Sequence, residues 1–459
     1  MVNKKTISEQ VIEVLESLSH DELKMYIIET SENNDQFQDL FLSFFAHKNP
    51  EDTKENYSKQ VRSILSNAAG RDGYIPWNQV SKAGMQVDEI LTIAQRHYEN
   101  KHFQTVIFIC CAVMEEMTLA FQFSDDSGDD IGSCIETANE LLYKTATEKL
   151  PEDIRVYLYN YCISSFEKKI FSDWDWHLDM LKIAAELISS EEEAQRITTL
   201  LDQVTESEFG KRETQLIKYS VIKNSKGEKE AEKYLIANID NPPFRRQAIQ
   251  IAINEKKYEQ AIKFSLDGIR QDELKLPGLA KEWTNWLLKI AKAQNDKDRI
   301  IEYARFLFME GFSREQDYYK LLKNTVESSR WAEFVEELLL DLSSNNRYPT
   351  TYRKAEIYIS EQWWHRLLLL IQQNPSLPLI EQYEDYLSKD YSNELLTLYS
   401  KEIIKFFNNG KDRKHYKNVC TYLRRMISLG GSELVEQIVS GFRNQFPIRK
   451  ALMEELDRI

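Results

Sequence analysis

Apolar residues recur at helical spacing along most of the chain, and residues 248–270 are the clearest case. Their apolar positions fall three or four residues apart, and the polar run 254–257 interrupts them. This pattern predicts two short amphipathic helices joined by a turn. Tyr258 precedes Ala261 by three residues, and such an aromatic and small pair lets one helix pack closely on the next. Looser copies of the pattern follow at 295–307, 329–340 and 361–371.

A single helical hairpin buries only part of its apolar surface, so consecutive hairpins are expected to stack on one another. From Trp331 to Trp364 the spacing is 33 residues, close to the repeat of roughly 34 in tetratricopeptide arrays. The full tetratricopeptide consensus does not recur. The pattern therefore predicts an all-α fold in which degenerate helical hairpins form a tetratricopeptide-like α-solenoid.

Breaks in the apolar pattern divide the chain into three expected segments. Residues 1–49 are an N-terminal helical segment, in which Ser19 and Glu22 have the spacing of a capping box. Residues 50–209 are an acidic helical domain, and residues 210–459 are the solenoid. The 459 residues include only 14 Gly and 10 Pro, which favours long helices with short connections.

Charge is distributed unevenly along the chain. The formal net charge is −15, and residues 1–209 carry 18 Lys and Arg against 38 Asp and Glu. Residues 401–459 reverse the sign, with 12 against 7. The acidic half would repel phosphate, so attraction of the whole chain to nucleic acid is not expected. The charge distribution still allows a local basic surface near the C-terminus.

Neither a membrane span nor a disulfide framework is expected. The sequence holds no run of about 18 apolar residues, and its start has no secretory signal pattern. Five cysteines are an odd number, scattered mostly within apolar stretches. These features predict a cytoplasmic protein in a reducing compartment.

Three stretches together resemble the helical region that follows the zinc finger in bacterial SWIM zinc-finger proteins. They are LSHDELKMYIIETSENNDQFQDLFL at 18–42, the segment 89–132, and the terminal IRKALMEELDRI. The finger itself needs Cys-x-Cys followed by Cys-x-His, because Zn²⁺ takes four tetrahedral ligands. No cysteine here has that spacing. The resemblance implies the helical scaffold without the finger, and no cofactor is predicted.

An acidic loop is the best candidate for a metal site. Four residues occupy positions 1, 3, 5 and 12 of a calcium-binding loop: Asp125, Ser127, Asp129 and Glu136. Position 6, which needs glycine for a sharp turn, is Asp130 instead. The favoured interpretation is a solvated loop whose carboxylates lie near the N-terminus of the next helix.

Motifs typical of enzymes are missing from the sequence. There is no His-Glu-x-x-His, no phosphate-binding glycine loop, no dinucleotide fingerprint and no nucleophile elbow. His97 and His102 lie five residues apart, on different faces of one helix or across its end, and are interpreted as packing or surface histidines. The sequence therefore predicts a protein that is not an enzyme.

The acidic loop and the tryptophans are candidates for protein binding. Trp283 and Trp286, three apart, are expected to face the core, and Trp174 and Trp176 form an aromatic patch. Adjacent tryptophans at 363 and 364 cannot both face one way, so one is expected at the surface or on a neighbouring repeat. The protein-binding candidates are Asp125, Asp126, Asp129, Asp130, Trp363 and Trp364.

A basic segment near the C-terminus suggests an alternative to protein binding, namely nucleic-acid binding. It interleaves cations with aromatics, a composition that grips phosphates and stacks bases, although a solvated helix face is favoured. Its candidates are Arg413, Lys414, Lys417, Arg424 and Arg425. The sequence thus predicts a non-catalytic cytoplasmic scaffold that binds a protein partner. The alternative is a nucleic-acid-associated accessory protein.

Overall fold

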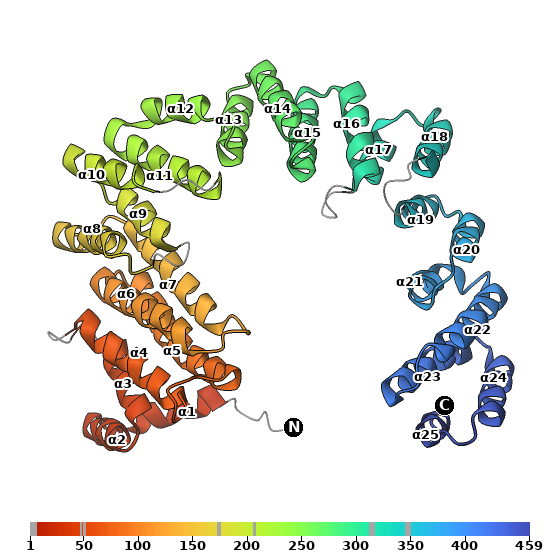
Figure 1. Ribbon diagram of the computed structural model, residues 1–459, viewed down its shortest axis with the longest axis horizontal. Helices are drawn as coiled ribbons and strands as arrows, with labels where there is room; N and C mark the ends of the chain where they lie inside the picture. Colours follow the sequence, from red (N-terminus) through yellow and green to blue (C-terminus); the bar gives the residue numbers. More distant parts are fainter. Residues whose placement is uncertain are drawn as a thin grey trace. The chain divides into compact units, whose positions relative to one another are not determined.

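The chain is all-α wherever the computed structural model describes it, namely residues 7–45, 48, 52–171, 176–204, 208–311, 317–344 and 350–459 (Figure 1). These residues form 25 α-helices and no β-strand; one parallel bridge joins Ile75 to Ser124. The predicted fold class, all-α, is confirmed.

Two compact units make up the chain, Met1–Phe244 (unit 1) and Arg245–Ile459 (unit 2). The division falls within helix α13 (Pro242–Asn254). The segment boundaries predicted at residues 49 and 209 stay predictions.

The helices of unit 1 follow one another with short connections. They are α1 (Ile7–Ser17), α2 (His20–Asn33), α3 (Asp35–Phe44), α4 (Lys54–Ala68), α5 (Trp77–Glu99), α6 (Phe103–Ala120), α7 (Asp130–Ala146), α8 (Glu152–Glu167), α9 (Trp176–Glu186), α10 (Glu191–Leu201), α11 (Glu208–Lys226) and α12 (Glu228–Ala237).

Local capping explains where α2 and α3 begin. The Ser19 side chain accepts the backbone N–H of Glu22, and the Glu22 carboxylate accepts the N–H of Ser19 at 2.8 Å. This is the predicted capping box, which satisfies N–H groups that the first turn cannot bond internally. Asn34 then ends α2 and caps α3, because its side chain accepts the N–H of Phe37.

Helix α6 is the centre of unit 1. It packs against α4, α5 and α7, and nearly all of its residues are buried. By length and composition alone the stretch Phe103–Phe123 could cross a membrane, the one such stretch in the described part of the chain. Within the unit, however, 72% of its apolar window is buried, which is the environment of a core helix.

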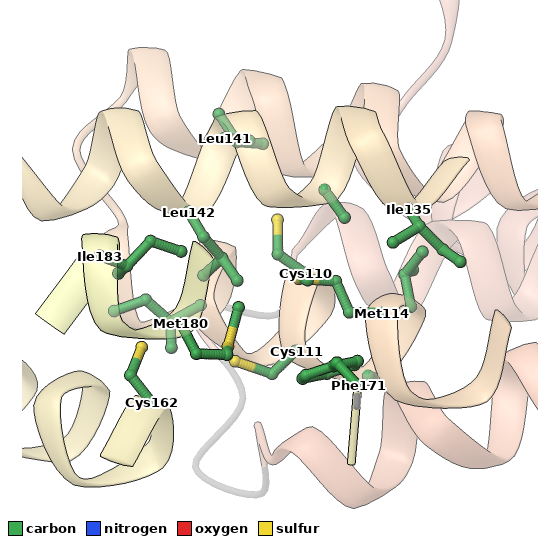
Figure 2. Close-up of a cluster of buried hydrophobic side chains, with 14 of the residues drawn as sticks. Cys110, Cys111, Met114, Ile135, Leu141, Leu142, Cys162, Phe171, Met180 and Ile183 are labelled. Carbon is green, nitrogen blue, oxygen red and sulfur yellow. The ribbon is translucent and has the colours of Figure 1, made fainter. Parts of the chain in front are cut away.

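All five cysteines are free and buried. Figure 2 shows Cys110 and Cys111 of α6 and Cys162 of α8 among methionine and aliphatic side chains. Burial raises the pKa of Cys134 to about 12 and that of Cys420 to about 11. The prediction that there is no disulfide framework is confirmed, and these thiols act as small apolar core residues.

Unit 2 builds its core as three clusters in chain order. Its helices after α13 are α14 (Tyr258–Asp272), α15 (Pro277–Gln294), α16 (Lys297–Glu310), α17 (Tyr318–Thr325), α18 (Trp331–Ser344), α19 (Thr351–Ser360), α20 (Trp364–Gln373), α21 (Leu377–Leu387), α22 (Ser392–Asn408), α23 (Arg413–Ser428), α24 (Ser432–Gln445) and α25 (Lys450–Leu456).

The two helices predicted within 248–270 are α13 and α14. Ala261 of α14 is completely buried, and Tyr258 packs against the same cluster, which also contains Ile249 and Ala252 of α13. Trp283 of α15 is also fully buried and donates its indole N–H to Asp272 at 2.6 Å. The expectation that Trp283 faces the core is confirmed, whereas Trp286 is half-buried.

Candidate functional site

The acidic loop between α6 and α7 uses its carboxylates to hold the start of α7. Asp126 accepts the backbone N–H groups of Ile131 and Gly132, at 2.9 and 3.1 Å. Asp130 accepts the hydroxyl of Ser81 on α5 at 2.6 Å. These contacts satisfy N–H groups of the first turn and complement the helix dipole. The structure therefore places the Asp126 carboxylate at the N-terminus of α7, and the interpretation of the whole loop as solvated stays a prediction.

The calcium-loop interpretation finds no support in this geometry. Asp125 accepts the backbone N–H of Ser127 within the loop, and Glu136 is exposed on α7. Asp129 adopts a left-handed backbone conformation with φ of 61°. Among the described residues, no three His, Cys, Asp or Glu side chains are arranged so that they could hold a metal ion.

The two adjacent tryptophans pack in different directions. Trp363 lies against the cluster of α15–α18, and the Arg366 guanidinium lies 4.3 Å from its ring centroid. Trp364 lies against the next cluster and stacks on Tyr386 with centroids 6.0 Å apart. Both are half-buried, so each bridges the core and the surface. Trp174, from the other predicted patch, lies outside the described residues.

The basic candidates on α23 fall into two groups. Arg413 pairs with Glu455 at 2.8 Å, and Arg425 pairs with Glu381 at 2.6 Å. The other three side chains are exposed, and Arg424 donates to a backbone carbonyl near the C-terminus. Because two of the five cations are engaged by carboxylates, the charge offered to a phosphate is smaller than the sequence suggests.

A polar cluster links α3, α5 and α6, and of its members the sequence indicated only the two histidines, His97 and His102. The His97 ring lies between the Ser43 carbonyl and the ring of His102, with nitrogen contacts of 2.9 and 3.2 Å. Asp52 accepts the hydroxyls of Tyr57 and Thr105 nearby, at 2.8 and 2.7 Å. His97 is only 3% exposed, so its ring is packed between these helices.

An exposed apolar stripe runs along α1 and ends at Leu18, directly after the helix. Four apolar side chains at helical spacing are between 37% and 57% exposed, and we name them the α1 stripe: Val11, Val14, Leu15 and Leu18. Met25 and Ile28 of α2 are exposed as well. A sequence of apolar residues at this spacing usually indicates a buried face, so the pattern by itself could not reveal that this one is uncovered.

Acidic residues accompany the α1 stripe. Residues 7–33 contain seven Asp or Glu against one Lys, which gives a formal charge of −6. The carboxylates of Glu13 and Glu16 lie on the helix face away from the stripe, since these residues follow Val11 and Val14 by two positions, about half a helical turn. The N-terminal helices therefore combine apolar contact area with negative potential.

Comparison of the sequence with protein-family models gives no match, and comparison with curated proteins gives none either. The resemblance to SWIM zinc-finger proteins stays a prediction.

Proposed function

We propose that this chain is a non-catalytic, cytoplasmic scaffold that binds a protein partner, and that its helical hairpins form a tetratricopeptide-like α-solenoid. The observation that carries the proposal is the α1 stripe. Contiguous apolar side chains left in water cost free energy that a bound partner would recover, at about 25 cal/mol per Å².

The arrangement of helices supports the solenoid part of the proposal. Among the described residues of unit 2, the larger contacts join helices that are neighbours in the chain, except for α23 with α25. Local stacking of this kind is what a quasi-one-dimensional repeat array requires. The three successive core clusters of unit 2 agree with it.

The nucleic-acid alternative has less support. Arg413 and Arg425 are ion-paired, and the exposed cations of α23 are few beside the acidic excess elsewhere. Catalysis has less support still, because the one histidine pair among the described groups is packed between helices.

The experiment compares three forms of the tagged full chain in lysate of its native cell. The double variant Val14→Gln/Leu15→Gln removes apolar area from the α1 stripe without changing charge. Leu340→Gln is the matched control. Leu340 lies in unit 2, away from the α1 stripe in the sequence, and is 70% exposed. We expect a protein captured by the parent and by Leu340→Gln to be lost with the double variant. Identical capture by all three forms would reject the stripe as the binding surface.

A further inference from the structure

We infer that the α1 stripe is the docking site for a basic amphipathic helix of a partner protein. This inference rests on the proposed function and names the chemistry of the partner. Helix α1, at the start of the chain in Figure 1, provides the apolar surface, and the charge of α1 and α2 selects the sign of the partner.

The spacing of the stripe fits a helix. Val11, Val14, Leu15 and Leu18 stand at i, i+3, i+4 and i+7. That is the row of anchors through which one helix packs along another. Each member of this row keeps more than a third of its surface exposed. An extended strand would find no free sheet edge, because the described residues contain no strand.

Charge decides among helical partners. The exposed face of α2 intersperses Met25 and Ile28 with the carboxylates of Asp21, Glu29 and Glu32. A helix that covers both the α1 stripe and this face of α2 therefore buries apolar side chains while placing its own charges beside carboxylates. Lysine and arginine next to leucine-type anchors meet both demands, because complementary potentials speed association and fix orientation.

The same charge disfavours two other occupants. A second copy of this chain would bring two segments of formal charge −6 together, within the Debye length of about 8 Å at physiological salt. A membrane surface carries anionic headgroups, which repel acidic segments and attract basic ones. Both occupants are therefore outcomes to be tested against the basic helix.

The probe is a fluorescent synthetic peptide of leucine and lysine with a helical apolar repeat. Two peptides serve as references, one with glutamate in place of lysine and one with the leucine and lysine order scrambled. Anisotropy titrations use the full chain, the stripe variant Val14→Gln/Leu15→Gln, the charge variant Glu29→Gln/Glu32→Gln, and the control Leu340→Gln. All substituted side chains are exposed, and circular dichroism verifies that each variant is folded.

We expect the parent and Leu340→Gln to bind the leucine–lysine peptide at least about tenfold more tightly than either reference peptide. The stripe variant should lose about tenfold in affinity. The charge variant should bind more weakly and show a smaller decrease of affinity with salt, because fewer charges are screened.

Other results would overturn the inference in distinguishable ways. Equal affinity for the lysine and glutamate peptides would mean purely apolar docking, and failure to bind any peptide while lysate capture persists would mean a different partner class. In both cases the proposed function survives. Sedimentation as a dimer that the stripe variant abolishes would assign the stripe to a second copy. Stripe-dependent binding to vesicles of phosphatidylcholine and phosphatidylserine would assign it to a membrane. Peptide affinity unchanged in the stripe variant, together with unchanged lysate capture, would reject both proposals.

Discussion

His97 and His102 face each other across the turn between α5 and α6, with their Nδ1 atoms 3.2 Å apart. The other ring nitrogen of His97, Nε2, lies 2.9 Å from the carbonyl oxygen of Ser43 on α3. A carbonyl oxygen only accepts, so the neutral His97 ring carries its proton on Nε2 and its Nδ1 accepts the Nδ1–H of His102. This chain of hydrogen bonds ties α3 to α5 and α6 while His97 is neutral.

Stability is therefore expected to fall in mild acid. Burial is the main cause that lowers the pKa of His97 in the folded chain, and His102 acts in the same direction. An exposed histidine has a pKa of about 6.5, so near and below that pH the unfolded chain binds the proton more readily. The stabilisation is complete above about pH 6.5 and is lost as the pH falls through the folded pKa. Urea unfolding of the full chain at about pH 7.5 and about pH 5 measures the loss.

The control for this prediction is His97→Gln, whose amide can still donate to the Ser43 carbonyl but does not titrate. The urea concentration at the midpoint of unfolding should depend less on pH for His97→Gln than for the parent. An equal dependence in both proteins would show that His97 is not the group responsible.

Gly268 of α14 is required by close packing. An added Cβ would lie 2.8 Å from Cδ1 of Trp283 and 2.7 Å from Cδ of Arg245, both fully buried side chains. Alanine in a helix gains about 1 kcal/mol over glycine, but overpacking a core costs about 1–3 kcal/mol. We expect Gly268→Ala to destabilise the chain by up to about 2 kcal/mol in urea unfolding. Gly441→Ala is the control, because Gly441 lies in α24 with nothing within 4 Å of an added Cβ. The prediction is wrong if the two substitutions have the same stabilising effect.

Substitutions of Asp126 and Asp125 should differ in their effect on stability, although both residues belong to the acidic loop. Asp126→Ala removes the acceptor for two N–H groups of α7 and should cost about 0.5–2 kcal/mol, as for a lost helix cap. Asp125→Ala removes a contact confined to the loop and should cost less than about 0.5 kcal/mol. Thermal unfolding in the presence and absence of Ca²⁺ completes the test. A rise in midpoint with Ca²⁺ that Asp125→Ala abolishes would restore the calcium-loop interpretation.

Substitutions of Arg425 and Lys414 test whether the basic segment stabilises the fold. Arg425 bonds to Glu384, which is buried and also accepts the hydroxyl of Tyr399 at 2.6 Å. Because Arg425 is partly solvated, Arg425→Gln should cost about 1–3 kcal/mol, between the values for exposed and buried ion pairs. Lys414→Gln, at an exposed position, should change stability by less than about 0.5 kcal/mol. Retention on RNA should be weak for the parent and unchanged by Lys414→Gln; a clear loss in that variant would favour the nucleic-acid alternative.

Helix boundaries were the part of this structure that local chemistry could predict. Ser19 and Glu22 predicted the start of α2, and the polar run after Asn254 predicted the turn before Tyr258. These features depend on residues within one or two turns of each other, so their physical causes are visible in the sequence. The burial of Trp283 could also be anticipated from the spacing of its apolar neighbours.

Contacts between distant residues could not be predicted in this way. The partner of His97 on α3 is 54 positions away in the chain, and Arg425 reaches Glu381 across 44 positions. Nothing in the local pattern distinguishes a cation that is ion-paired from one that is free to bind phosphate. The basic segment therefore looked more available in the sequence than it is in the folded chain.

Two stripes with the same apolar period show what each level of structure decided. Val11, Val14, Leu15 and Leu18 repeat the spacing of the stripe on α4 that contains Val61 and Leu65. The sequence determined that both segments are amphipathic helices, because periodicity is a local property. Only the tertiary structure decided that the α4 stripe is buried against α6, whereas the α1 stripe faces solvent. Burial depends on which other helices fold back to cover a face, and those helices lie elsewhere in the chain.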